Sequence, residues 1–241
     1  KDVIKNIIPE YDCKLPTTGK KVKFRPLLVK EEKFISQINE LSETLPEKLE
    51  SLTELVNSCC NYSIDSKNMS VYDFQYLLMK IRTKSISEIS QLKLTCPTTE
   101  ESVVANIDFE HETKNMKSIK DKKEIILNNN VKLSFRIPTM LDMIKTNCEF
   151  KNDNDIVKIL PFCLTEVETE SSTVNLELES HENKIKLIEA MTRKNYSQIK
   201  KELEEGIYTV KIEYQTSDGV DRKVVSSDFV NFLKFYLVML I

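Results

Sequence analysis

The sequence predicts an α+β fold: an N-terminal helical part followed by antiparallel hairpins and further helices. Between residues 27 and 81, apolar side chains recur every three or four positions, which is the spacing of a buried helix face. Farther along, β-branched runs flank residues 128–130 and 217–219, where asparagine, aspartate and glycine favour hairpin turns. With 241 residues, of which 40% are hydrophobic, the chain can bury a core as one large domain or two small ones.

The first strand and the first helix share one short stretch. Residues 16–19 have the composition of a turn, and residues 21–25 alternate charged and apolar side chains as a half-buried strand does. From residue 27 to residue 41 the apolar spacing changes to that of a helix. Glu31 and Glu32 are expected near its first turn, where the helix dipole favours negative charge.

Two more helices complete the N-terminal part. Pro46 begins the second, because proline is tolerated in the first turn of a helix. Its apolar face ends at Cys59 and Cys60, which we interpret as buried structural thiols, since no histidine stands nearby to complete a metal site. Ser70 is expected to cap the third helix, with Asp73 three residues later as in a capping box.

The middle of the chain is expected to be rich in strands. Residues 86–94 and 103–109 are two predicted strands joined by a turn. The charged and weakly patterned residues 114–123 are the best candidate for a mobile loop. A second hairpin is predicted from residues 124–127 and 131–137.

Four helices are then expected, at residues 139–148, 156–164, 184–192 and 196–203, and Thr139 is expected to cap the first of them. Pro161 is expected to kink the second of them or to mark a new start. The acidic residues 166–170 indicate a solvated loop or an edge strand. A last hairpin is predicted from residues 207–214 and 220–225.

These elements suggest three parts. Residues 1–85 form the strand, turn and helical part, residues 86–138 form the antiparallel strand-rich part, and residues 139–241 contain helices, a hairpin and an apolar C-terminal helix. One continuous domain is the alternative.

No catalytic, cofactor-binding or metal-binding residue is predicted, and we expect no enzyme activity. His111 and His181 lie in charged, exposed segments without a nearby set of metal ligands. The six cysteines have no paired spacing, so reduced thiols are expected. The sequence has no phosphate-binding loop or dinucleotide-binding fingerprint, and its net charge of -3 gives no electrostatic argument for nucleic acid.

Basic residues around the first strand form one candidate partner-binding surface. Its members are Lys14, Lys20, Lys21, Lys23 and Arg25, with Phe24 between them. Lysines along one face of a strand protect an exposed edge from aggregation or face a partner. The alternative is a contact with phosphate groups, in which Phe24 supplies a stacking ring.

The apolar C-terminal segment is the second candidate. Residues 228–241 are apolar on all sides, but the segment is short and Lys234 interrupts it, so it is a poor membrane span. It is expected to be a buried helix or a partner-binding one, with Phe232, Phe235 and Tyr236 as candidate contact residues.

Two sequence blocks resemble a known family. They are LPTTGKKVKFRPLLVKEEK at residues 15–33 and YDFQYLLMKIRTKSISE at residues 72–88. Both are similar to the baseplate hub family of T-even-type contractile-tail phages, which includes a hub subunit and a hub assembly factor. The resemblance extends over residues 12–240 and is strongest before residue 100.

This resemblance implies a structural protein of the baseplate hub, located in the tail of the virion and in the host cytoplasm during assembly. Its partners would be other hub proteins, and homo-oligomers around the tail axis are one expected arrangement. The first alternative is an assembly factor that acts on hub parts and is absent from the virion. The second is a contact of the basic strand with nucleic acid or with a tape-measure protein.

Overall fold

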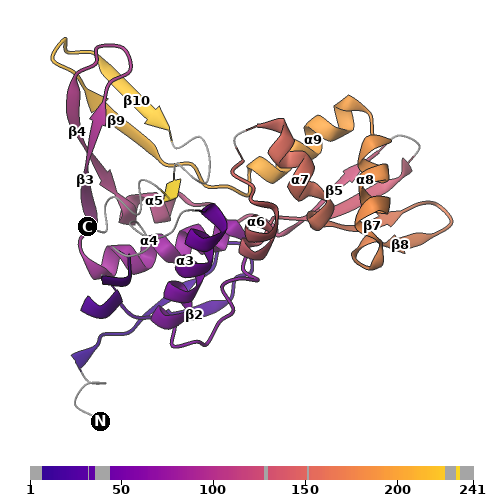
Figure 1. Ribbon diagram of the computed structural model, residues 1–241, viewed down its shortest axis with the longest axis horizontal. Helices are drawn as coiled ribbons and strands as arrows, with labels where there is room; N and C mark the ends of the chain where they lie inside the picture. The colour runs from indigo at the N-terminus through magenta and orange to yellow at the C-terminus, as the bar shows by residue number, and fades with distance from the viewer. Residues whose placement is uncertain are drawn as a thin grey trace.

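A computed structural model describes residues 7–31, 33–35, 44–127, 130–150, 152–225 and 232–233. Its helices and antiparallel sheets confirm the predicted α+β fold. Two lobes lie side by side in Figure 1. One contains the N-terminal helices and two projecting hairpins, and the other contains a sheet covered by C-terminal helices.

Three N-terminal elements agree with the predicted ones: β2 (Lys21–Phe24), α3 (Leu45–Cys59) and α4 (Val71–Ser85). The strand that pairs with β2, β1 (Tyr11–Lys14), was not predicted. Thr44 caps α3 in a complete capping box with Glu47, and the Ser70 side chain accepts a hydrogen bond from the Asp73 N–H at the start of α4. Residues 29–31 and 33–35 are helical, and the rest of the predicted first helix, residues 36–41, lies outside the described residues.

Two hairpins pack together beyond α4. Their strands are β3 (Ile89–Thr95) with β4 (Ser102–Asp108), and β9 (Lys211–Gln215) with β10 (Asp221–Val225). β4 lies against β9, and both hairpins project from the lobe in the same direction (Figure 1). A short helix, α5 (Phe109–Asn115), follows β4 and was not predicted. The loop expected over residues 114–123 is therefore shorter, because its two ends belong to α5 and to the next strand.

The second lobe is built on a four-stranded antiparallel sheet. In spatial order its strands are β5 (Lys122–Ile126), β6 (Lys132–Arg136), β7 (Leu164–Glu168) and β8 (Thr173–Asn175). The prediction that residues 166–170 form a solvated loop or an edge strand is wrong for Glu166 and Glu168, because β7 pairs with β6 on one side and β8 on the other. The sheet also joins strands from both sides of residue 138, where a boundary was expected.

The helices of this lobe follow β6 and β8 in the chain. They are α6 (Met140–Thr146), α7 (Asp153–Cys163), α8 (His181–Glu189) and α9 (Arg193–Glu204), with the 3-10 turn η2 (Leu176–Leu178) before α8. Thr139 caps α6 as predicted. Pro161 lies inside α7, which continues to Cys163 without a new start. Within the described ranges, no helix is long and apolar enough to cross a membrane.

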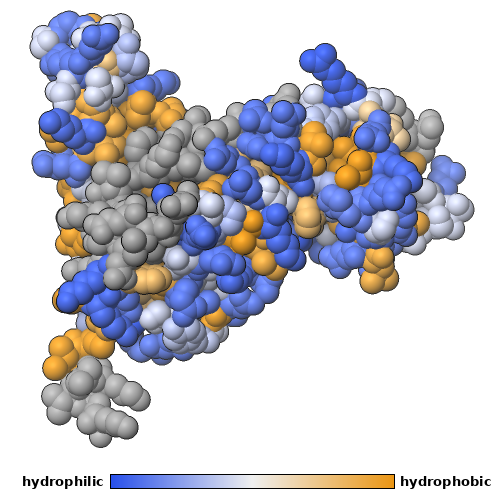
Figure 2. Space-filling view, in the orientation of Figure 1, coloured by the Kyte–Doolittle hydropathy of each residue, from blue (hydrophilic) through white to orange (hydrophobic). Residues whose placement is uncertain are grey.

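Helix α4 is at the centre of the core. Phe74, Leu77 and Leu78 are fully buried, and one cluster of buried side chains extends from the N-terminal hairpin to α9. Most of the surface in the view of Figure 2 is hydrophilic, with apolar residues in small separate groups. Within the described part of the chain, the core cluster therefore holds most of the large apolar side chains, and those that remain exposed include Ile7, Val29 and Leu178.

Candidate partner-binding surface

The side chains of the β1–β2 hairpin lie on two faces, one toward the core and one toward the solvent. In its register Tyr11 is opposite Phe24, and these two rings face the core with their centroids 5.8 Å apart. On the outer face Lys14 is opposite Lys21. Like charges directly opposite each other destabilise a strand pair, so this arrangement is unfavourable unless another charge compensates it.

The turn of this hairpin is fixed to the start of α4. Asp73 accepts hydrogen bonds from the Thr17 N–H at 2.8 Å and from the Thr17 hydroxyl at 2.5 Å. Within the turn, the Leu15 N–H donates to the Lys20 carbonyl oxygen, and Gly19 has a φ of +67°, which glycine adopts without strain. The hairpin thus has a defined orientation on the helix.

Asp73 is fully buried, and burial raises the pKa of its carboxyl group, although the hydrogen bonds from Thr17 oppose that shift. Its partners are hydroxyl and amide groups, and no salt bridge to it occurs within the described part of the chain. Asp73 therefore acts as a hydrogen-bond acceptor that positions the turn.

A buried ion pair holds the chain where it leaves β2. The Arg25 guanidinium donates to both carboxylate oxygens of Glu31, at 2.7 and 2.9 Å, and also to the side-chain oxygen of Ser58 in α3. Glu31 further accepts a hydrogen bond from the Leu28 N–H at 2.7 Å. Arg25 and Glu31 are 7% and 5% exposed, so the pair belongs to the interior.

Opposing effects act on the ionisation of Glu31. Burial disfavours the charged carboxylate, but hydrogen bonds from Arg25, the Leu28 N–H and Ser58 outweigh burial and lower the pKa of Glu31. The hydrogen bond with Glu31 raises the pKa of Arg25. Both groups are charged at neutral pH, and the pair stays intact.

Three polar residues at the start of α4 connect distant segments. The Tyr72 hydroxyl donates to the Lys117 carbonyl oxygen, and Asp73 holds the β1–β2 turn. The Gln75 side chain exchanges two hydrogen bonds with the backbone of Tyr208, at 2.8 and 3.0 Å. The sequence block around these residues therefore has a structural role that its pattern alone does not reveal.

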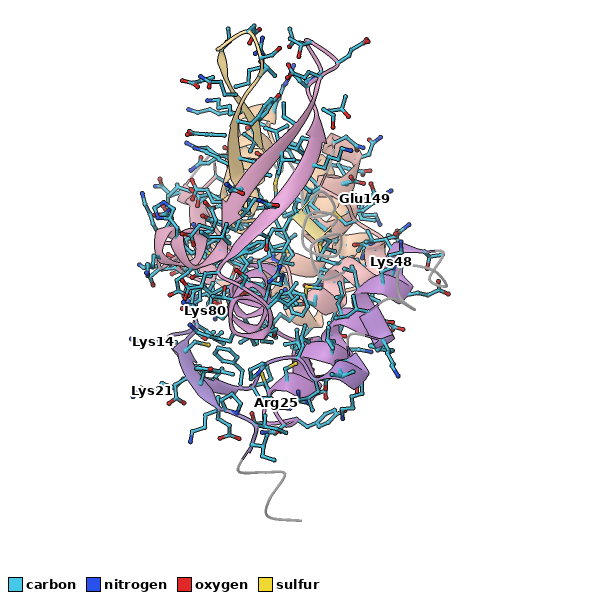
Figure 3. The ribbon with its side chains drawn as sticks, turned by 90° about the vertical axis from the view of Figure 1, so that its left-hand side faces the viewer. Lys14, Lys21, Arg25, Lys48, Lys80 and Glu149 are labelled. Atoms are coloured by element: carbon cyan, nitrogen blue, oxygen red, sulfur yellow. The ribbon has the colours of Figure 1, made fainter. Side chains whose placement is uncertain are left out.

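The exposed lysines of the hairpin are the group open to a partner. We call Lys14, Lys20, Lys21 and Lys23 the lysine surface. All four are exposed, and their ammonium groups form no ion pair with any residue that the structure describes. Figure 3 shows Lys14 and Lys21 near each other at the outer edge of the hairpin, whereas Arg25 lies closer to the body of the molecule.

The other candidate residues have different positions. Phe24 is 2% exposed, so its ring is not available for stacking on a base, and Arg25 is engaged with Glu31. Phe232 is 1% exposed and belongs to the core cluster. Phe235 and Tyr236 lie outside the described residues. Of the predicted contact residues, the structure leaves the lysines exposed.

Other reactive groups do not gather into a site. His111 and His181 are exposed, and Cys59 and Cys60 are buried as predicted. Burial raises the pKa of each of these two thiols to about 12. Over the ranges that the structure describes, no group of three or more histidine, cysteine or acidic side chains could hold a metal ion.

The described residues thus form an α+β body with exposed lysines on its N-terminal strand pair. In a comparison with known families, a model described as T4 bacteriophage base plate protein matches residues 8–234. The chain belongs to this family. It is a structural component of a phage tail baseplate, and its partners are other phage tail proteins. No individual curated protein and no solved structure matches it.

Proposed function

We propose that the chain is a structural subunit of the baseplate hub, retained in the virion and acting by protein–protein assembly without catalysis. One observation carries this proposal: the two sequence blocks that resemble the hub family interlock. Thr17 of the first block binds Asp73 of the second, and the Leu27 N–H donates to the Ser85 hydroxyl at the other end of α4.

The interlocked blocks form a platform for the lysine surface. Because β2 is held by Asp73 at one end and by Arg25 at the other, the lysines are presented without a large loss of backbone entropy on binding. Such a surface can enforce an order of assembly if it stays exposed until its partner covers it. Burial of apolar area around it would contribute roughly 25 cal/mol per Å².

The test is quantitative mass spectrometry of purified virions and of hub intermediates from infected cells, with a known hub subunit as the internal reference. A fixed ratio of this chain to that subunit in both samples is the expected result. If the chain occurs in the intermediates alone, it is an assembly factor that leaves before the virion is complete. If it is missing from both, the hub assignment is overturned.

A contact with nucleic acid is the remaining alternative, favoured by the exposed lysines alone. Binding to DNA or RNA releases counterions, so its affinity must fall steeply with added salt. Filter binding with a random oligonucleotide at several salt concentrations distinguishes nucleic-acid binding from the proposed hub function. We expect no salt-dependent retention, since Phe24 is buried and supplies no stacking surface.

A further inference from the structure

The outer face of the four-stranded sheet contains a small polar hollow of about 170 Å³. Three carboxylate side chains line it, from Glu124 on β5, Glu166 on β7 and Glu177 in η2, together with Thr165 and Lys122. We call the three glutamates and Thr165 the acidic socket.

Thr165 enters this hollow because of a β-bulge. Ser134 pairs with Glu166, and Phe135 pairs with Leu164, so Thr165 is an extra residue without an opposite partner on β6. Bulges of this kind redirect a side chain. Thr165 is 8% exposed, yet its hydroxyl oxygen has no hydrogen-bond partner among the described residues. A buried hydroxyl without a partner costs free energy, which a ligand at this position could recover.

The charge around the hollow is negative. Lys132 bridges Glu124 and Glu168, with nitrogen–oxygen distances of 3.0 and 3.6 Å. Glu166 and Glu177 form no ion pair with any residue in the described ranges. Besides Lys132, which bridges Glu124 and Glu168, Lys122 also lies at the hollow. An ammonium group has three hydrogen-bond donors and no acceptor, so it matches two carboxylates and a hydroxyl oxygen.

We propose that the acidic socket receives lysine side chains from the lysine surface of a second copy of this chain. Among the described residues, the four lysines of the lysine surface and the carboxylates of Glu166 and Glu177 form no ion pair, although Asp12 lies opposite Lys23 and Lys122 lines the hollow. The two surfaces have net charges of opposite sign. They cannot neutralise each other within one copy, because β2 and the four-stranded sheet belong to different lobes (Figure 1). A second copy supplies the complementary charge and relieves the repulsion between Lys14 and Lys21.

This contact joins two different surfaces, so it is a head-to-tail contact. Such contacts generate a ring if the rotation between copies closes, and an open filament if it does not. The inference goes beyond the proposed hub function and does not depend on it. It concerns the purified chain alone, whereas the hub assignment is decided on virions.

Charge reversal tests the contact. Lys21→Glu/Lys23→Glu reverses the lysine surface, and Glu166→Lys/Glu177→Lys reverses the acidic socket. In analytical ultracentrifugation at low salt we expect the wild-type chain to self-associate and each double variant to associate about tenfold more weakly or worse. Mixing the two variants should restore association, because each reversed surface then meets a complementary one. Combining all four substitutions in one chain should restore it as well.

Lys93→Glu/Lys223→Glu is the matched control, since both lysines are exposed on strands away from the two surfaces and have the same charge. It should associate like the wild type. Circular dichroism of every variant establishes that the fold is retained. A wild-type chain that stays monomeric at all concentrations, or an association that survives both reversals, would overturn the proposal.

Thr165→Val tests the socket without a change in charge. If the hydroxyl oxygen accepts a hydrogen bond from the incoming ammonium group, this variant should associate about threefold to tenfold more weakly, while the monomer folds at least as stably. Unchanged association of Thr165→Val would remove the socket as the docking position and overturn that part of the proposal.

Discussion

At the scale of single residues, the buried pair of Arg25 and Glu31 distinguishes Arg25, which stabilises the fold, from the exposed lysines that precede it. The alternation of charged and apolar residues predicts that Arg25 points outward like Lys21 and Lys23. The strand ends at Phe24, however, and the Arg25 N–H bonds to the Cys59 carbonyl oxygen instead of continuing the strand pair. The period-two pattern therefore stops one residue before Arg25, and its side chain turns inward.

Replacing one member of this pair leaves the other as a buried, uncompensated charge. We expect Arg25→Met to lower the free energy of unfolding by about 3–5 kcal/mol. The double variant Arg25→Met/Glu31→Gln should recover part of this loss, because it leaves no buried charge. Urea denaturation of both proteins measures the difference. A double variant less stable than the single one would contradict this account of the pair.

The same pair predicts a dependence of stability on pH. The pKa of Glu31 is lower in the folded state than its ordinary value of 4.5. Its contribution to stability is therefore present above pH 4.5 and is lost as the pH falls through the lower, folded-state pKa. Below pH 4.5 the wild type should lose stability more steeply than Arg25→Met/Glu31→Gln, measured as the urea midpoint at a series of pH values. Parallel curves would contradict the prediction.

At the scale of elements, the turn of the β1–β2 hairpin depends on Asp73. Asp73→Ala removes the acceptor for the Thr17 N–H and hydroxyl, and a buried donor left without a partner costs about 1–3 kcal/mol. Asp73→Asn keeps one acceptor for the N–H and removes the buried charge, so its loss should be smaller. Thermal unfolding ranks the two variants, and hydrogen exchange at residues 17–20 reports the freed turn. Equal losses would mean that the charge itself is required.

Elements defined by local signals could be predicted from the sequence, and those defined by distant partners could not. Ser70 and Thr139 were predicted as helix caps because a cap bonds residues three positions away. The inner position of β7 was not predicted, because the acidic sequence of the strand does not indicate that it pairs with both β6 and β8. Likewise the exposure of Lys21 and Lys23 follows from the local alternation of residues, whereas the position of Thr165 depends on a bulge that no local pattern indicates.

At the scale of the whole molecule, the two projecting hairpins are tied together at their ends. Glu101, before β4, accepts hydrogen bonds from the N–H and the hydroxyl of Ser217 in the other turn, both at 3.0 Å. These residues are more than one hundred positions apart in the chain. The contact therefore joins the ends of two hairpins that also pack together through β4 and β9.

Glu101→Ala should loosen the ends of both hairpins without a large change in global stability, because the contact is exposed. Hydrogen exchange should accelerate at residues 96–101 and at residues 216–219 together. Glu100→Ala is the matched control, since Glu100 is the residue before Glu101, is exposed, and is not the acceptor of the Ser217 hydrogen bonds. Acceleration in one hairpin only would show that the two ends move independently.

The hydrogen bonds between Gln75 and Tyr208 also limit how early during translation this part of the core can form. The two residues are 133 positions apart, so at about 5–20 residues per second the ribosome needs on the order of ten seconds to deliver the second after the first. Throughout that interval the Gln75 side chain lacks the Tyr208 backbone as its hydrogen-bond partner. Residue 208 therefore has to be translated before these two hydrogen bonds can form, and a chain that stops before residue 208 would leave the buried Gln75 side chain without them.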